Sequence, residues 1–123
     1  MQNEIRSAIY NVLESVFSPV YFHEAKQGTE APYCVFDIVS APVNRDTATQ
    51  YEEIYFQFVL YGKSLAGIEA DKVILDASLR DPESFDFDSF EIVTLIQMMH
   101  IKPRIFSGLW QVGSQFKIEV QPI

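Results

Sequence analysis

The sequence predicts an α+β fold, an antiparallel sheet of about five to six strands with two helices packed on one face. Three observations lead to this class. Hydrophobic residues recur at helical spacing in residues 3–17 and again in residues 65–80. Residues 51–61 and 110–121 alternate between apolar and polar positions, which is typical of half-buried antiparallel strands. The order is helix, strand, strand, repeated once, and 123 residues are enough for one domain over residues 1–123.

The first helix is expected over residues 3–17, with Asn3 as a candidate N-cap and Pro19 preventing a long continuation. A short strand is expected at VYFHE, followed by the polar turn KQGTEAP. The segment APYCVFDIVSAP then predicts a strand over residues 33–40 that Pro42 closes. The apolar stripe of the helix consists of Ile5, Ala8, Ile9, Val12, Leu13, Val16 and Phe17.

The strongest strand signal is YEEIYFQFVLYG, which follows a polar segment, NRDTATQYE, expected to be a loop or a widened hairpin connection. Ser64 is expected to cap a second helix that runs to about Arg80, in which Asp76 and Arg80 are placed to pair. One strand face carries Ile54, Phe56, Phe58 and Leu60, and the other Glu53, Tyr55, Gln57, Val59 and Tyr61. The helix stripe is predicted as Ala66, Ala70, Val73, Ile74 and Ala77, broadened by Leu75 and Leu79.

The last part of the chain predicts two more strands. FEIVTLIQMMHI favours a strand through its β-branched content, and KPRIFSGL is expected to bend or continue it. The final segment, WQVGSQFKIEVQP, alternates regularly. Its inward residues are Trp110, Val112, Phe116, Ile118 and Val120, and its outward ones Gln111, Gln115, Lys117, Glu119 and Gln121.

The charge balance limits the classes of partner. The chain has 17 acidic and nine basic residues, a formal net charge of −8, so direct nucleic-acid binding through a broad face is not expected. One cysteine excludes an intrachain disulfide and a thiolate metal cluster. The N-terminal segment lacks the pattern of a signal peptide, and no apolar run approaches the roughly 20 residues of a membrane span. We therefore expect synthesis in a cytoplasm and no membrane partner.

No catalytic motif is visible. His23 and His100 lack a second ligand at metal spacing, and Cys34 reads as a small apolar strand residue. The glycines form neither a phosphate loop nor a dinucleotide fingerprint, so no cofactor is expected. An acidic cluster reads as a solvated loop, although weak binding of a divalent cation stays open: Asp81, Glu83, Asp86, Asp88 and Glu91.

Strand alternation places Asp37 on an otherwise apolar face with Tyr33, Val35 and Val39, whereas Cys34 lies on the opposite face. Mixed aromatic and polar faces of this kind suit a surface that meets another subunit. A plain exposed sheet face explains the pattern equally well. The two alternatives stay open at this level.

The order of these segments resembles a known family. LESVF leads through Val20 and Tyr21 to A-P-Y-x-V-F-D, then Y-E-E-I-x-F-Q-F-x-L-Y, S-L-x-x-I-E-A and a closing F-K-I-E-V. This is similar to the tail terminator and minor tail (tail-completion) proteins of long-tailed bacteriophages and their prophage relatives. The resemblance covers essentially the whole chain. It lies in the order and general character of the segments and not in an invariant motif. Its most specific parts are Pro32-Tyr33-Val35-Phe36 and residues 51–61 with the helix that follows.

The resemblance implies a structural role without an active site. Proteins of this family form rings, commonly hexameric, that cap the growing tail tube, stop its elongation and join it to the head. The implied partners are copies of the chain, the tail tube protein and head–tail connector proteins, and the implied place is the head-proximal end of the virion tail, assembled in the host bacterial cytoplasm. The subunit-interface candidates are Tyr33, Val35, Asp37, Tyr55, Val59 and Tyr61, and loop 44–50 supplies tube-contact candidates Asn44, Arg45 and Asp46.

Two alternatives remain. A neck or head-closure component would also assemble as a ring, but it would contact the connector. A small α+β hydrolase or ligand-binding domain would instead use Asp37, Cys34 or His100 in a concave pocket of clustered titratable groups.

Overall fold

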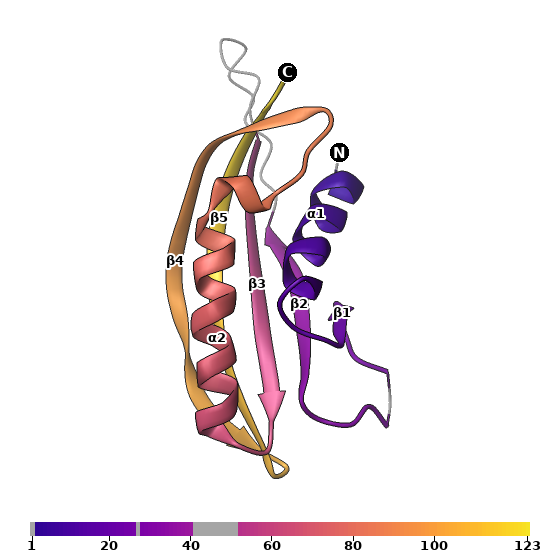
Figure 1. The fold of residues 1–123 in the computed structure, drawn as a ribbon, viewed down its shortest axis with the longest axis vertical. Helices are drawn as coiled ribbons and strands as arrows, with labels where there is room; N and C mark the ends of the chain where they lie inside the picture. Colours follow the sequence, from indigo (N-terminus) through magenta and orange to yellow (C-terminus); the bar gives the residue numbers. More distant parts are fainter. Residues whose placement is uncertain (1, 27, 41–51) are drawn as a thin grey trace.

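The computed structural model describes residues 2–26, 28–40 and 52–123. The described residues form two α-helices and a five-stranded sheet, which confirms the α+β class (Figure 1). The elements are α1 (Gln2–Glu14), β1 (Val20–Phe22), β2 (Tyr33–Ser40), β3 (Glu52–Gly62), α2 (Leu65–Arg80), the 3₁₀ helix η1 (Pro82–Ser84), β4 (Phe90–Phe106) and β5 (Leu109–Pro122). Helix α1 begins at Gln2, so Asn3 lies within the helix and the prediction that it caps the helix is wrong.

The strand order is β1-β2-β3-β5-β4. Among the described strands, β2–β3, β3–β5 and β4–β5 pair antiparallel, whereas β1 pairs with β2 in parallel. The sheet is therefore mixed, not wholly antiparallel as predicted. A parallel neighbour requires a connection that returns to the starting edge. Here the described residues between Phe22 and Tyr33 contain no helix.

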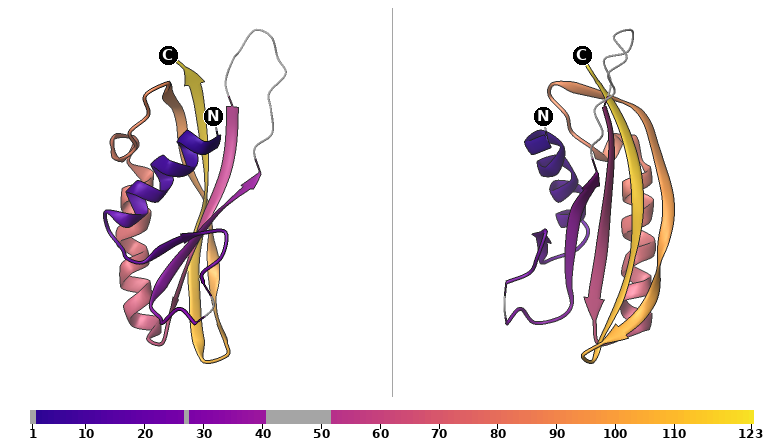
Figure 2. Two further views of the ribbon diagram at one scale, coloured as in Figure 1. Left: turned by 90° about the vertical axis from the view of Figure 1, so that its right-hand side faces the viewer. Right: turned by 180° about the vertical axis from the view of Figure 1, so that it is seen from behind.

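Both helices lie on the same side of the sheet (Figure 2). The core fills the space between them and the inner sheet face, where every second residue of β3 from Ile54 and of β5 from Ser114 to Val120 is buried. The predicted inner row of β3 is confirmed, and Cys34 is buried beside it. The fully buried sheet residues include Cys34, Ile54, Phe56, Phe58, Leu60, Phe116 and Ile118. Ser64 caps α2 as predicted, because its Oγ accepts a hydrogen bond from the Gly67 backbone N–H at 3.2 Å.

The predicted packing stripe of α2 is largely wrong. Val73 and Ile74 are 66% and 53% exposed, and the alanines of the predicted stripe are exposed too. The buried positions are Ile68, Leu75, Asp76 and Leu79, with Lys72 half-buried between them. Two charged residues thus occupy the inward side of the helix. A prediction based on hydrophobic residues alone therefore assigns the wrong face of α2 to the core, because it treats charged positions as facing solvent.

Strand β4 continues through the first part of KPRIFSGL, the segment that was expected to bend or continue it. Residues 102–106 continue β4 past Pro103, and Phe106 pairs with Leu109 across a two-residue turn. Ser107 and Gly108 both have positive φ, 52° and 78°, which a type I′ hairpin turn requires. The pairing shifts register at three places along β4, between Ile92 and Thr94, Gln97 and Met99, and Ile101 and Arg104.

Candidate functional site

The outer face of the sheet brings the predicted interface candidates together. In the β2–β3 ladder Tyr33 lies opposite Tyr61 and Val35 opposite Val59, while Asp37 lies opposite Gln57. The Tyr33 and Tyr61 rings stack with centroids 4.8 Å apart. Tyr55, two residues before Gln57 and on the same face, completes the set; all are half-buried. We call Tyr33, Val35, Asp37, Tyr55, Val59 and Tyr61 the outer-face patch. The predicted tube-contact residues Asn44, Arg45 and Asp46 lie outside the described residues.

A cavity of about 380 Å³ opens on this patch. Its floor is Tyr33, Val35 and Tyr61, and its wall is the segment after β1: His23, Glu24, Ala25, Lys26, Gly28 and Thr29. Asp37 Oδ2 lies 3.3 Å from His23 Nδ1 at the edge of this region. Partial burial, with a smaller contribution from the neighbouring Tyr33, raises the pKa of Tyr61 above its usual value. We call this space the β1–β2 cavity.

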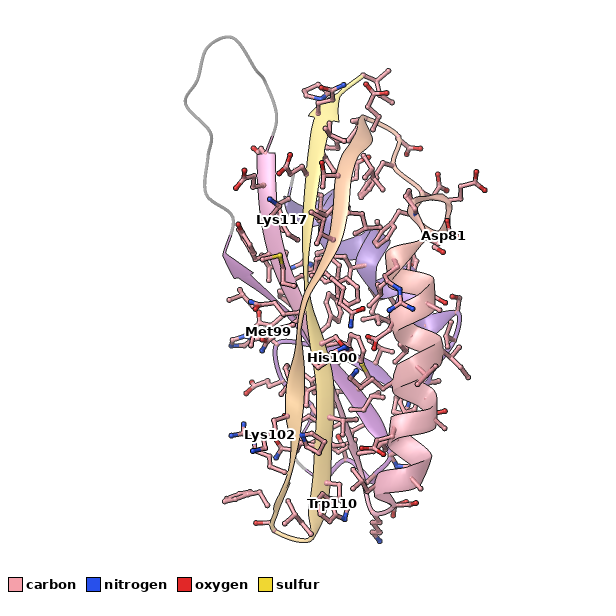
Figure 3. The ribbon with its side chains drawn as sticks, turned by 90° about the vertical axis from the view of Figure 1, so that its left-hand side faces the viewer. Asp81, Met99, His100, Lys102, Trp110 and Lys117 are labelled. Atoms are coloured by element: carbon pink, nitrogen blue, oxygen red, sulfur yellow. The ribbon has the colours of Figure 1, made fainter. Side chains whose placement is uncertain are left out.

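The hairpin carries a second surface that the sequence interpretation missed. Six of its large apolar side chains are exposed, with Phe106 the most exposed at 72%: Val93, Ile96, Met98, Met99, Ile105 and Phe106. Strand β4 is an edge of the sheet, and Met99 projects away from α2 whereas His100 projects toward it (Figure 3). The register shifts break the strict alternation of β4, so its apolar residues reach both faces and the sequence pattern cannot tell which are covered.

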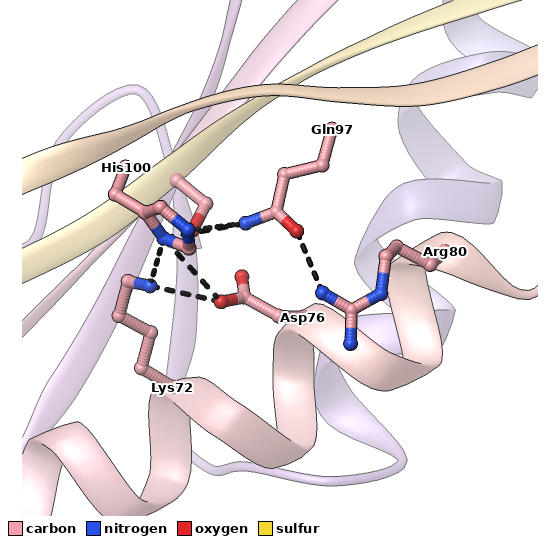
Figure 4. A network of polar contacts seen from close by, with 6 residues as sticks. Lys72, Asp76, Arg80, Gln97 and His100 are labelled. Carbon is pink, nitrogen blue, oxygen red and sulfur yellow. Dashed lines mark hydrogen bonds and ion pairs between the residues drawn. The ribbon is translucent and has the colours of Figure 1, made fainter.

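A polar network joins α2 to the hairpin on the inner side (Figure 4). Lys72 Nζ lies 2.9 Å from Asp76 Oδ2 and 2.6 Å from His100 Nδ1, and His100 Nδ1 is 4.0 Å from Asp76 Oδ2. Asp76 is buried, and its Oδ1 has no hydrogen-bond partner among the described residues. The predicted Asp76–Arg80 pair is wrong, because Arg80 donates to Gln97 Oε1 at 2.7 Å instead.

The residues considered for hydrolysis or ligand binding lie in three different places. Cys34 is buried on the inner face, and this burial raises its thiol pKa to about 12. Asp37 is on the outer face beside His23. His100 lies beside α2, across the ladder from Ser114, whose buried hydroxyl accepts a hydrogen bond from Gln97. This arrangement suits a structural link between α2 and the hairpin better than nucleophilic chemistry, which needs an accessible hydroxyl paired with its base.

The acidic segment before β4 is held by backbone contacts. Asp81 Oδ1 accepts a hydrogen bond from the Glu83 N–H and caps η1, while Glu4 Oε1 accepts from the N–H groups of Asp88 and Ser89 at 2.8 and 3.0 Å. In the described ranges, no group of three or more histidine, cysteine or acidic side chains is placed to hold a metal ion. None of the described helices has the length and apolar character that crossing a membrane requires.

Comparison with known proteins shows the fold and not a family. No family model matches the chain, and no curated protein matches it. Solved structures share this fold, among them two that match over nearly the whole chain. One is a chain from the virion of a native gene transfer agent particle, 12% identical, with a TM-score of 0.68, covering 97% of this chain and 90% of its own. The other is 18% identical, with a TM-score of 0.70, covering 98% and 96%.

Proposed function

We propose that this protein is a non-enzymatic structural component of a virion and that it acts as a tail terminator, a ring that caps the tail tube, stops its elongation and joins it to the head. The observation that carries the proposal is the shared fold with the gene transfer agent virion chain, end to end in both chains. The resemblance of the segment order to phage tail terminators, noted from the sequence, supports the finer assignment.

The two exposed surfaces are those that a ring subunit needs. A closed ring of identical copies uses a heterologous contact, in which one patch of a subunit meets a different patch of the next. The outer-face patch with its cavity lies over β2 and β3, and the exposed apolar residues lie along the edge strand β4. Large exposed apolar areas rimmed by polar groups are characteristic of protein–protein contact sites.

A tube-elongation assay tests the proposal. Tail tube protein is polymerised with and without this chain, and tube length is measured by electron microscopy. We expect shorter, uniform tubes with a ring at one end when the chain is present. Native mass spectrometry over a concentration series should show a single closed oligomer, for which the family resemblance suggests six copies. Unchanged tube lengths together with a strict monomer would contradict the proposal. Binding to the head connector but not to the tube would instead favour a neck component.

A further inference from the structure

We propose that the end of the β4–β5 hairpin of one copy docks into the β1–β2 cavity of a second copy, with Phe106 entering the cavity and Arg104 beside the carboxylates of Glu24 and Asp37. The inference rests on the proposed ring function, since it names the subunit contact that would build the ring. Four observations support it: the charge of the hairpin, the chemistry of the cavity, the placement of both at the same end of the molecule, and the interrupted edge of β4.

The hairpin is electrostatically opposite to the rest of the chain. Residues 92–118 contain no aspartate or glutamate and three basic residues, Lys102, Arg104 and Lys117. The remainder of the chain holds all 17 acidic residues and six of the nine basic ones. Near the turn, Lys102, Arg104 and Phe106 are all exposed. The hairpin therefore offers a basic and apolar end to an acidic molecule, and a second copy of the chain supplies the complementary charge.

The cavity has the matching chemistry. Its floor of two stacked tyrosines and a valine presents aromatic faces and a branched side chain, which suit an aromatic ring such as that of Phe106. Glu24 lines the wall, and Asp37, on the same sheet face as the floor residues, contacts the lining residue His23. Lys26 also lines the wall, so Glu24 and Lys26 balance each other there, and Asp37 adds a carboxylate beside His23 at the edge of the cavity. A guanidinium held beside these carboxylates fixes orientation as well as attraction.

The two surfaces are placed for a head-to-tail contact. They belong to opposite parts of the sheet, since β4 is one edge and β1, whose following loop walls the cavity, is the other. Figure 1 shows the β4–β5 turn and the loop between β1 and β2 toward the same end of the long axis. Copies related by rotation about an axis along that direction would bring one surface against the other at the same height. An open row of copies always has one free hairpin at one end and one free cavity at the other, until the ring closes.

The main alternative is pairing of two β4 edges through their backbones. Three register shifts and Pro103 interrupt the edge of β4, so a continuous ladder with a second strand cannot form along it. Contact through side chains is therefore favoured over strand addition. It also explains why the exposed side chains near the turn are large and apolar.

Disulfide trapping tests the contact. Cys34 is fully buried, so the native chain offers a silent background for engineered cysteines. Phe106→Cys and Lys26→Cys are made as separate variants, mixed and oxidised. The matched control pairs Phe106→Cys with Ile123→Cys, because Ile123 is 82% exposed but lies toward the opposite end of the molecule (Figure 1). We expect at least about a tenfold higher yield of covalent dimer from the first mixture, and a ladder of oligomers from the double variant. Equal yields in the two mixtures would overturn the contact.

A charge variant gives an independent readout. Arg104→Glu should weaken self-association by at least about tenfold in native mass spectrometry, whereas Arg104→Lys, which keeps the positive charge, should weaken it much less. A ring that forms without the Phe106–Lys26 cross-link refutes this contact but leaves the proposed function standing. A chain that neither self-associates nor shortens tail tubes refutes both. Circular dichroism melts check that each variant remains folded.

Discussion

The inner and outer faces of the sheet are built from the same strands but differ in burial and composition. Along β3, Phe56 and Phe58 point under the helices and are fully buried, whereas their neighbours Tyr55 and Val59 point outward and are only half-buried. The buried residues of the inner face are apolar side chains and the Cys34 thiol, apart from Ser114 and the buried Asp76 of α2 above it. The outer face mixes tyrosine, valine, glutamine and aspartate. The first composition excludes water permanently; the second can be wet in the free subunit and covered in an assembly.

The largest expected effect separates two adjacent aromatic residues. Phe56→Ala should cost about 3–5 kcal/mol of unfolding free energy, because it removes a fully buried ring and leaves a cavity. The matched Tyr55→Ala, one position along the same strand but on the outer face, should cost about 1 kcal/mol or less in the free subunit. Urea denaturation of both variants measures the difference. Equal losses would mean that the two faces do not differ as described.

The buried charges on the inner side should be the next most sensitive. Lys72→Met leaves Asp76 without its partner in a buried position where Oδ1 already lacks a hydrogen bond, and should cost about 3 kcal/mol. The double variant Lys72→Met/Asp76→Leu removes both charges and should recover most of that stability. Denaturant midpoints of the single and double variants give the answer. A double variant no more stable than the single one would contradict it.

The buried thiol should make stability depend on alkaline pH. Burial holds the Cys34 pKa at about 12 in the folded chain, against 9.0 for a free thiol. Between these values the unfolded chain releases the proton and the folded chain keeps it, so stability falls as pH rises through this window, by about 1.4 kcal/mol per pH unit. The contribution is fully present below pH 9. Denaturation at several alkaline pH values measures the unfolding free energy against pH. Cys34→Ala should reduce the slope of this plot relative to the parent chain, even if it also changes the overall stability. Identical slopes would contradict the role of the thiol.

The smallest effect belongs to the outer face. The Asp37–His23 pair is solvent-exposed, so Asp37→Ala should change the unfolding free energy by no more than about 0.5 kcal/mol. Its effect should instead appear in self-association, because Asp37 borders the β1–β2 cavity. Thermal melts and native mass spectrometry on the same sample separate the two quantities. A large loss of stability with unchanged association would reverse this assignment.

The fold was predictable where one face is wholly apolar. Strict alternation located β3 and β5 and their inner rows, and turn residues bounded β2. The pairing order was not predictable, because parallel addition of β1 depends on contacts distant in sequence. The buried face of α2 was predicted wrongly, because it carries Lys72 and Asp76, which pair with each other. A hydrophobic pattern assigns such inward positions to alanine and valine instead.

The candidate site was predictable in part. Alternation alone put the six outer-face patch residues on one side of β2 and β3. It could not show that the segment after β1 folds over them and forms a cavity, since that depends on the path of a connection without periodicity. The exposed apolar edge of β4 was missed because register shifts scatter its side chains between faces. One signal was available from the sequence, the absence of acidic residues from 92–118 in so acidic a chain.

The register shifts of β4 have a consequence for the fate of the protein at high concentration. Between them, no stretch of the β4–β5 ladder runs longer than four residues in unbroken register. Amyloid growth needs a straight, regular edge onto which six or seven residues of another molecule can add as a strand. A protein that is proposed to terminate a polymer should not itself form fibrils. The irregular edge of β4 therefore offers no regular template for fibril growth, and it is compatible with the proposed contact between copies through side chains.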